Sequence, residues 1–269
     1  MSRAGGRKSI FITGAASGIG AETARLFAKR GWFCGLYDVN MDGVSAVQEE
    51  IGEKNCITAS LNVCSRDDWR IAVKAFGEAT EGAMNVLFNN AGIGRHGWFE
   101  DVSGEDNDSI IDVNVKGVIN GVQACLPLLK ATSGARIVNT ASTAGIVGSP
   151  QLAVYSASKF AVRGLTEALD AEFRDLDIRV TSLMPWFIET PILEMGDRDG
   201  SNHKMSDQLR EAGMNVYPVS MAAERAWDAA HGKDVHYMVG KDAERAKFMT
   251  RWLPGAIRKR VKDGVPPRD

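Results

Sequence analysis

Short apolar runs alternate along the chain with longer segments in which apolar residues recur every three or four positions. The short runs predict seven strands, at residues 9–13, 33–38, 56–61, 85–89, 136–140, 178–184 and 235–239. The longer segments predict helices, chiefly at residues 19–30, 42–51, 65–80, 106–130 and 153–176. Strands this apolar are buried on both faces, so helices must cover each side of the sheet. The pattern therefore predicts an α/β fold: a single doubly wound domain with a seven-stranded parallel sheet flanked by helices.

Two segments fall outside this alternation, an insertion at about 186–217 and a C-terminal tail at 241–269. In the tail, residues 243–253 have a helical pattern that Pro254 ends, and residues 257–262 are rich in Arg and Lys. A basic amphipathic segment of this kind can lie on an anionic membrane. The interpretation we favour is a helix packed on the body or on a partner subunit, with a solvated basic end.

Composition narrows the class of protein only a little. The chain has 269 residues, of which 44% are apolar and 25% charged, as in an ordinary globular protein. Because 32 basic side chains face 34 acidic ones, charge gives no argument for nucleic-acid binding. The four cysteines show no C-x-x-C spacing, and no apolar run approaches the roughly eighteen residues of a membrane helix. We therefore expect a soluble, cytoplasmic protein.

A glycine-rich loop follows the first predicted strand and precedes the first helix, reading T-G-A-A-S-G-I-G over residues 13–20. Glycine lacks a Cβ, so this backbone can approach a pyrophosphate, and the free N–H groups of the next helix attract the anion. A glycine pattern alone is weak evidence, but its place between a strand and a helix favours dinucleotide binding over a simple turn. The expected contacts are Gly14, Ser17, Gly18, Ile19 and Gly20.

Asp38 ends the second predicted strand, eighteen residues after Gly20. A carboxylate here accepts hydrogen bonds from the ribose hydroxyls of the adenosine and repels a 2′-phosphate. The plainer alternative is an Asp that caps the next helix. No Arg or Lys follows closely, and Ser17 in the loop is neutral. The sequence therefore predicts NAD in preference to NADP.

Residues 142–159 bring together a hydroxyl at Ser142, a phenol at Tyr155 and an ammonium at Lys159. Tyr155 and Lys159 are four residues apart in a predicted helix, which puts them on one face. A nearby cation lowers the pKa of a phenol, and a phenol tuned in this way can exchange a proton with a substrate oxygen. Taken alone the pattern is common, and an ordinary amphipathic helix explains it better.

In combination, these features resemble the classical short-chain dehydrogenase/reductase family over roughly residues 8–240. The sequence N-N-A-G at 89–92 and Asn114 complete the set, which is specific although each piece alone is not. The resemblance implies a Rossmann-type dinucleotide-binding and catalytic domain at 1–240, with a substrate lid at about 186–217 and a helical basic extension at 241–269. It also implies a homo-oligomer, either a tetramer or a dimer.

The resemblance assigns a role to each of four catalytic residues. Tyr155 is the general acid/base and Ser142 orients the substrate oxygen. Lys159 binds the nicotinamide ribose and lowers the pKa of the phenol. Asn114 holds a water on a proton relay to Lys159, unless it is a helical Asn with no such role.

Further cofactor contacts follow from the same resemblance. Residues 89–92 close the fourth strand and support the adenosine side of the cofactor, while Ile188 and Thr190 contact the carboxamide of the nicotinamide. No metal site is expected. The positions assigned to the cofactor beyond the glycine loop and Asp38 are Asn62, Val63, Asn90, Ala91, Gly92, Tyr155, Lys159, Pro185, Ile188 and Thr190.

The chain departs from the family pattern at two of these places. Asn62 stands where the family has Asp near the adenine, and its amide can still form a hydrogen bond. Trp186 follows Pro185 where the family has Gly beside the nicotinamide. The indole must therefore either reshape that wall of the site or turn outwards.

The substrate site is expected to be apolar. Residues 186–195 are mostly apolar, residues 95–99 should reach the same cleft, and apolar pockets suit apolar or aromatic ligands. Packing against the fold or a neighbouring subunit is an equal alternative, and a loop His without a role is the plainer explanation of His96. Residues 196–202 are polar and predict a mobile loop. The candidate substrate contacts are His96, Trp98, Trp186 and Leu193.

The sequence thus predicts an NAD-dependent alcohol dehydrogenase or carbonyl reductase for a bulky, apolar secondary alcohol or its ketone, aryl or steroid-like. A 3-ketoacyl reductase is an alternative, which Asp38 disfavours because that reaction commonly draws on NADPH. An NAD-binding regulator on the same fold is a third hypothesis, less favoured because it would not need all four catalytic residues.

Overall fold

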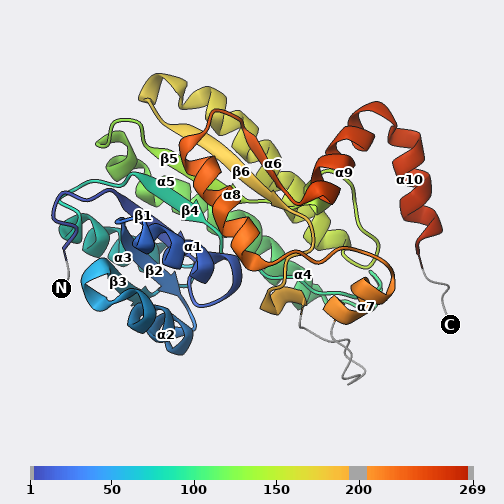
Figure 1. The fold of residues 1–269 in the computed structure, drawn as a ribbon, viewed down its shortest axis with the longest axis horizontal. Coiled ribbons are helices and arrows are strands. Elements are labelled where there is room, and N and C mark those ends of the chain that lie inside the picture. Colours follow the sequence, from blue (N-terminus) through green and yellow to red (C-terminus); the bar gives the residue numbers. More distant parts are fainter. Residues whose placement is uncertain (1–2, 194–204, 266–269) are drawn as a thin grey trace.

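Seven parallel strands form one sheet in the order β3-β2-β1-β4-β5-β6-β7 (Figure 1). The structure is a computed structural model and describes residues 3–193 and 205–265. Strand order reverses at β1, which lies between β2 and β4, and ligands of such sheets bind outside the strand ends at this point. The strands are β1 Ser9–Thr13, β2 Phe33–Asp38, β3 Cys56–Ser60, β4 Val86–Asn89, β5 Arg136–Thr140, β6 Arg179–Pro185 and β7 His236–Val239.

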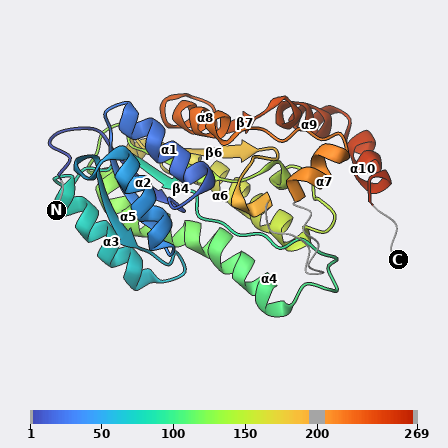
Figure 2. The same ribbon diagram turned by 60° about the horizontal axis from the view of Figure 1, so that its bottom comes forward.

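Helices cover both faces of the sheet, as Figure 2 shows for α1 and α8 on one side and α3 and α5 on the other. These two layers and the sheet make up the doubly wound, Rossmann-type fold that the pattern predicts, so the predicted fold class is confirmed. The helices are α1 Gly18–Lys29, α2 Met41–Ile51, α3 Arg66–Ala79, α4 Gly104–Ile111, α5 Gly117–Lys130, α6 Ala153–Glu172, α7 Met205–Glu211, α8 Val219–His231, α9 Lys241–Trp252 and α10 Pro254–Asp263.

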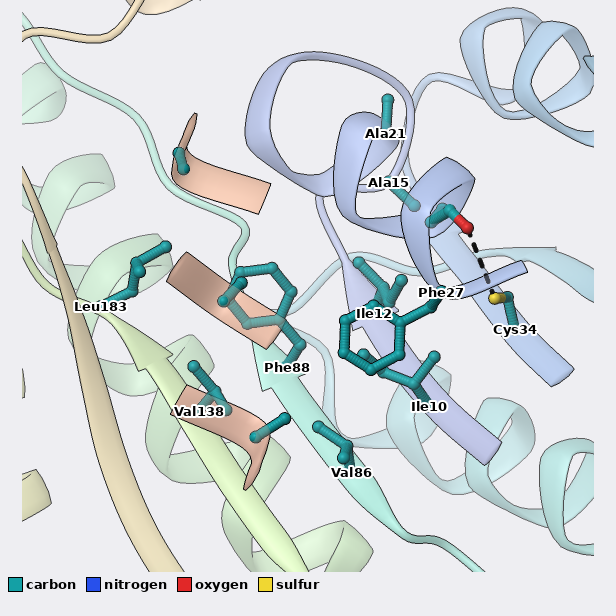
Figure 3. Close-up of a cluster of buried hydrophobic side chains, with 14 of the residues drawn as sticks. Ile10, Ile12, Ala15, Ala21, Phe27, Cys34, Val86, Phe88, Val138 and Leu183 are labelled. Carbon is teal, nitrogen blue, oxygen red and sulfur yellow. Dashed lines mark hydrogen bonds between the residues drawn. The ribbon is translucent and has the colours of Figure 1, made fainter. Parts of the chain in front are cut away.

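The core on the α1 and α8 side is built from alternate residues of the central strands (Figure 3). Ile10 and Ile12 of β1 point to this side and meet Phe27 of α1, while Phe11 points to the other side and stacks on Tyr37 at 3.9 Å between ring centroids. All five side chains are essentially inaccessible to solvent. Burying each apolar side chain of this size stabilises the fold by about 1.5–3 kcal/mol, which fixes the strand register below the site.

Side-chain caps determine where helices begin. Ser65 accepts a hydrogen bond from the backbone N–H of Asp68 at the start of α3, and Ser103 accepts one from Asp106 at the start of α4. Asn40 caps α2 through the N–H of Gly43. Each cap satisfies an N–H group that the helix itself leaves unpaired, and is worth about 1 kcal/mol.

Two helical segments differ from the predicted pattern. The predicted helix at 106–130 consists of α4, a π-helical segment at Asp112–Lys116 and α5. Helix α8 was not predicted, because its buried face is made of alanines, which give little apolar contrast. These alanines are Ala222, Ala223, Ala226, Ala229 and Ala230.

The C-terminal tail forms two helices. Pro254 ends α9 and begins α10, a position that suits proline because the first helical residue needs no N–H donor. Helix α9 packs on β7 and on the turn Thr143–Gly145, whereas α10 packs on α9 and stands away from the body (Figure 1). Within residues 3–193 and 205–265, no helix combines the length and apolar character needed to cross a bilayer.

Candidate active site

The glycine loop forms a tight cradle at the carboxyl end of β1. Gly14 and Gly18 have φ angles of +68° and +53°, which residues with a Cβ rarely adopt. A Cβ on Gly20 would lie 2.0 Å from the carbonyl oxygen of Gly14. The close approach of these backbones leaves room for no side chain, so glycine is required at each position.

Helix α1 begins in this cradle and presents its N-terminus to it. Ser17 precedes the helix in extended conformation and makes no side-chain cap, so the first N–H groups are left for a ligand. Ile19, also predicted to contact the cofactor, lies in the first turn of α1 and packs on the core beside it. A Cβ on Gly18 would lie 3.1 Å from Cγ2 of Thr190, which places the predicted contact Thr190 across the loop.

Asp38 lies beside this cradle at the end of β2. Its carboxylate accepts hydrogen bonds from the backbone N–H groups of Ala16 and Asn40, at 3.1 and 3.0 Å. Both bonds orient the carboxylate at the rim of the glycine loop. This is the position from which a carboxylate reaches the ribose hydroxyls of a dinucleotide whose pyrophosphate lies on the loop.

Asn90 ties the glycine loop to the neighbouring strands. Its amide donates to the carbonyl oxygens of Thr13 and Gly14, at 3.1 and 3.2 Å, and its oxygen accepts from Thr140. The backbone N–H groups of Asn90 and Ala91 both donate to the hydroxyl of Thr13. The side chain of Asn90 therefore holds the loop in shape.

The predicted adenine contacts lie after β3. Asn62 is exposed, and its oxygen accepts from the N–H of Cys64 at 3.0 Å, which leaves its NH₂ group for a ligand. Val63 is buried, and its carbonyl accepts from Trp69 and from Asn120. The turn after β3 is thus fixed from both sides.

The three candidate catalytic groups meet at the carboxyl end of β5. Ser142 lies just after β5 and accepts from the N–H of Ala144 at 3.1 Å, while Tyr155 and Lys159 lie in the first turns of α6. The hydroxyl groups of Ser142 and Tyr155 are hydrogen-bonded. The ammonium of Lys159 donates to the carbonyl of Thr140 at 2.8 Å and lies 5.5 Å from the centroid of the phenol ring.

Burial dominates the protonation of this group. It raises the pKa of Tyr155, and the hydrogen bond with Ser142 offsets only part of that rise. It also lowers the pKa of Lys159 from 10.5 to about 8. In the chain alone, the ammonium over the ring therefore does not bring the pKa of the phenol below its ordinary value. The lowering that the resemblance implies remains a prediction for the complex with cofactor.

Asn114 lies in the π-helical segment and is completely buried. Its side chain donates to the carbonyl of Ile93 and to the hydroxyl of Ser158, and accepts from the N–H of Ile93. It thereby joins the loop after β4 to the helix that carries Tyr155. Such single π turns in α-helices occur frequently at functional sites.

Two glycines allow these elements to approach one another. A Cβ on Gly92 would lie 3.2 Å from the oxygen of Asn114 and 3.5 Å from the ammonium of Lys159. A Cβ on Gly145 would lie 2.6 Å from the carbonyl oxygen of Lys159. The second glycine was not singled out from the sequence, because its role depends on a contact between elements distant along the chain.

The nicotinamide end of the predicted site is formed by the segment after β6. The carbonyl of Pro185 accepts from the hydroxyl of Thr143 at 3.2 Å, which links this segment to the turn after Ser142. Ile188 is buried in the core and forms an isolated β-bridge with Tyr217.

Trp186 turns towards the interior. Its indole packs on the cluster that contains Met184, Met238 and Ala243, and its ring lies 5.2 Å from that of Phe187. The indole N–H is buried and has no hydrogen-bond partner within the described part of the chain. Of the two alternatives expected from the sequence, the indole therefore does not turn outwards; it packs inside the protein, on the side of Pro185 where Met184 and Met238 lie.

A narrow cavity lies beside Tyr155, between α4 and the start of α6. Of the predicted substrate contacts, His96 and Trp98 lie on the loop that lines it without lining it themselves, and Leu193 is buried. Residues 194–204, which include the whole of the predicted mobile loop at 196–202, lie outside the described residues. Besides Tyr155, the cavity is lined by Arg95, Gly97, Phe99, Val102, Asn107, Ile110, Gln151, Ala153 and Val154.

The cradle, the carboxylate of Asp38 and the Ser142–Tyr155–Lys159 group fit a nicotinamide dinucleotide. The glycine backbones make room for a pyrophosphate, and the catalytic group lies across the switch point from Asp38.

Comparison with known proteins gives the same picture. The family model for short chain dehydrogenases matches residues 8–201. Cyclohexanol dehydrogenase of Acinetobacter sp. (strain SE19) is 38% identical over 197 residues, which cover 72% of this chain and 78% of that protein. The 3-oxoacyl-[acyl-carrier-protein] reductase of Thermotoga maritima is 36% identical over 214 residues, covering 79% and 83%.

Solved structures extend the likeness to almost the whole chain. A short-chain dehydrogenase/reductase from Burkholderia phymatum in complex with NAD has a TM-score of 0.82 and 26% identity, covering 98% of each chain. A 3-ketoacyl-(acyl-carrier-protein) reductase from Brucella melitensis complexed with NADH has a TM-score of 0.76 and 31% identity, covering 86% of this chain and 96% of that one. With the fold, the glycine cradle and the family match in agreement, this chain belongs to the short-chain dehydrogenase/reductase family of oxidoreductases.

Proposed function

We propose that the protein is an NAD-dependent oxidoreductase that transfers a hydride between the nicotinamide and a secondary alcohol or ketone. The observation that carries the proposal is the Ser142–Tyr155–Lys159 group, with its buried ammonium, beside the glycine cradle. Residues 1–240 would form the cofactor-binding and catalytic domain, with a lid at about 186–217 and an extension at 241–269.

In this proposal the bound nicotinamide supplies or accepts the hydride, and the protein handles the proton. In the oxidation direction, the phenolate of Tyr155 takes the proton of the substrate hydroxyl while Ser142 donates to the same oxygen. Lys159 holds the ribose and stabilises the phenolate charge. Asn114, buried in the π-helical segment, would hold a water on a proton relay to Lys159.

NAD is preferred over NADP in this proposal. The carboxylate of Asp38 is fixed by Ala16 and Asn40 at the rim of the cradle, where it would accept from ribose hydroxyls and repel a 2′-phosphate. NAD and NADH are the cofactors named for the two similar structures, which supports a nicotinamide cofactor here.

The substrate we propose is bulky and largely apolar. Phe99, Val102, Ile110 and Val154 make the surroundings of Tyr155 partly apolar, which favours apolar groups on the carbinol carbon. The similarity to a cyclohexanol dehydrogenase supports a cyclic or aryl alcohol. A 3-ketoacyl substrate is the second candidate, because two similar proteins are 3-oxoacyl or 3-ketoacyl reductases.

The test is a panel of alcohols and ketones assayed by absorbance of the reduced nicotinamide, with NAD(H) and with NADP(H). We expect turnover of cyclic and aryl secondary alcohols with NAD, at least about tenfold above NADP, as the loss of a charged contact would give. Activity confined to small polyols would contradict the substrate class, and preference for NADPH with 3-ketoacyl thioesters would favour the second candidate.

A further inference from the structure

The segment after β6 connects the two halves of the candidate active site. We call residues 185–190 the nicotinamide segment. At its start, the carbonyl of Pro185 accepts a hydrogen bond from Thr143, the residue after the candidate catalytic serine. At its end, Thr190 lies against the glycine cradle, where a Cβ on Gly18 would be 3.1 Å from its Cγ2. The position of this segment therefore affects both the cofactor and the catalytic group.

Backbone hydrogen bonds attach the nicotinamide segment to later parts of the chain. The N–H of Trp186 donates to the carbonyl of Val239, the last residue of β7, at 3.2 Å. The carbonyl of Phe187 accepts from the N–H of Tyr217, and the N–H of Glu189 donates to the carbonyl of Tyr217, both at 2.9 Å. The main chain of the segment is thus held along one edge.

The side chain of Trp186 makes a second attachment, to a cluster of buried apolar residues. Ala141 and Ile146 of this cluster lie on either side of residues 142–145, which contain Ser142 and the turn after it. The cluster therefore joins the nicotinamide segment to the turn that carries the serine. We call it the support cluster; its buried members are Val118, Ala141, Ile146, Val162, Met184, Met238 and Ala243.

Helix α9 contributes to the support cluster from the C-terminal side. It follows β7 directly (Figure 2) and packs on β7 and on the turn Thr143–Gly145. Ala243, its member of the cluster, is completely buried, and Ala246 is 6% exposed. Both β7 and α9 lie beyond residues 8–201, the part of the chain that matches the family model. The tail helix thus reaches the candidate active site through its small residues.

We propose that Trp186 is a positioning residue, which transmits the packing of α9 to the nicotinamide segment and to the turn with Ser142. An indole provides a large, rigid contact area at a low cost in conformational entropy. Held in the support cluster, it fixes the backbone between Pro185 and Phe187. This inference rests on the proposed function, because it concerns the nicotinamide end of the same site.

Trp186 would act through the backbone and not by touching the substrate. It is not among the described residues that line the cavity beside Tyr155. Its indole packs instead on the support cluster, whose members come from β6, β7, α6 and α9 as well as from the turn after β5. The candidate substrate contact that the sequence suggested is therefore replaced by a role in placing the cofactor.

Placement matters most at the nicotinamide end. Hydride transfer needs the reacting carbons in a narrow range of distance and direction, and a misplacement of about 1 Å can lower the rate roughly 100-fold. The adenosine half would be held separately, by the glycine cradle and Asp38. A loosened nicotinamide segment should therefore weaken binding of the nicotinamide half and leave the adenosine half unaffected.

The experiment compares the binding of NADH with that of ADP-ribose, which lacks the nicotinamide, by titration calorimetry. The ratio of the two dissociation constants reports the nicotinamide end alone, because both ligands share the adenosine half. The variant Trp186→Ala removes the indole, and Trp186→Phe keeps an aromatic ring. Ala243→Leu disturbs the support cluster from α9.

Trp227→Ala is the matched control. Trp227 is half-buried, as Trp186 is, and packs on Phe27 and Trp32. Trp32 precedes β2 at the amino end of the sheet, whereas the candidate site lies at the carboxyl end. This control should lower the melting temperature, as Trp186→Ala does, and leave the ratio of the dissociation constants unchanged.

We expect the unaltered protein to bind NADH more tightly than ADP-ribose. Trp186→Ala should reduce this preference at least about fivefold, while ADP-ribose binds as before. Trp186→Phe should keep most of the preference, and Ala243→Leu should reduce it. On a substrate from the panel, the kcat of Trp186→Ala should fall about tenfold or more.

Two results would overturn the inference. One is a preference for NADH in Trp186→Ala, or in Ala243→Leu if the first variant does not fold, equal to that of the unaltered protein. The other is an equal loss of preference in Trp227→Ala, which would trace the effect to general destabilisation. Failure of the proposed function would be seen separately, as an unaltered protein that binds neither NADH nor ADP-ribose.

Discussion

The proposed cofactor side and the proposed substrate side of the site are built in different ways. On the cofactor side, Asp38, Asn90 and the glycines are fixed by backbone groups of loops that directly follow adjacent strands. On the substrate side, the cavity beside Tyr155 is lined by the loop after β4, the helix α4 and the start of α6. The proposed cofactor contacts thus come from local motifs, whereas the proposed substrate contacts depend on how distant segments pack.

The largest effect on the cofactor side is expected for Gly20→Ala. The added Cβ would lie 2.0 Å from the carbonyl oxygen of Gly14 and 2.7 Å from the amide nitrogen of Asn90, so the cradle must shift. Overpacking of this kind costs about 1–3 kcal/mol. If that cost falls on the bound state, the dissociation constant of NADH rises roughly five- to 150-fold. Fluorescence titration with NADH measures it.

Gly104→Ala is the matched control, because a Cβ there would meet no atom within 4 Å. NADH binding to this control should stay unchanged. If the Gly20→Ala protein binds NADH as tightly as the unaltered protein, the loop can accommodate a side chain. The contrast between a rigid cofactor side and a variable substrate side would then be wrong.

Lys159 lies between the two sides, and its burial should lower the free energy of unfolding. Its pKa is lowered to about 8 from 10.5, so below pH 8 the folded chain holds a buried charge that the unfolded chain hydrates. That difference in pKa corresponds to a destabilisation of roughly 3 kcal/mol, which the variant Lys159→Met would remove. The variant would also lose the hydrogen bond to Thr140, which stabilises the fold by about 1 kcal/mol. We therefore expect Lys159→Met to be inactive yet more stable than the unaltered protein at pH 7.

The advantage of Lys159→Met should shrink as the pH rises from 8 to 10.5. In that range the folded protein releases the proton while the unfolded chain keeps it, so the stability of the unaltered protein increases with pH. Urea unfolding at pH 7 and pH 9.5 measures both proteins. A gap that stays constant or widens would mean that the ammonium is not destabilised by burial.

Asp38→Ala is expected to change the selection between NAD and NADP. Losing hydrogen bonds to a charged acceptor costs about 1.5–3 kcal/mol. The affinity for NAD should therefore fall roughly tenfold or more, and the discrimination against NADP should narrow. Asp42→Ala removes the same charge four residues later, in the first turn of α2, and serves as the control. An unchanged NAD/NADP ratio in the Asp38 variant would remove this residue from cofactor selection.

The sequence predicts most of the fold, because the sheet depends on patterns that lie within single strands. All seven strands are found, with no end misplaced by more than one residue. Helix α8 escapes prediction because its buried face is alanine, and the π turn at Asp112–Lys116 depends on the contacts of Asn114 with other elements. The tail helix is where predicted, but its exposed Phe248 and Trp252 could not be foreseen from a helical pattern alone.

The residues of the site also fall into those that a local sequence pattern marks and those that it does not. Gly20 and Asp38 are recognisable because each follows a strand at a set spacing. Val102 and Gln151 approach Tyr155 through loops that meet only in the folded chain, where the N–H of Gly97 donates to the carbonyl of Gln151. Gln151 has a φ of +60°, and no local pattern marks it.

The central claim is that Tyr155 exchanges a proton with the substrate oxygen, and Tyr155→Phe tests it most directly. The variant keeps the ring and removes only the hydroxyl. Tyr237→Phe is the control, since its hydroxyl accepts from the N–H of Asp234, away from the site. On a substrate found in the panel, we predict that Tyr155→Phe lowers kcat at least about 100-fold while NADH binds as before. Turnover equal to that of the unaltered protein would contradict the account.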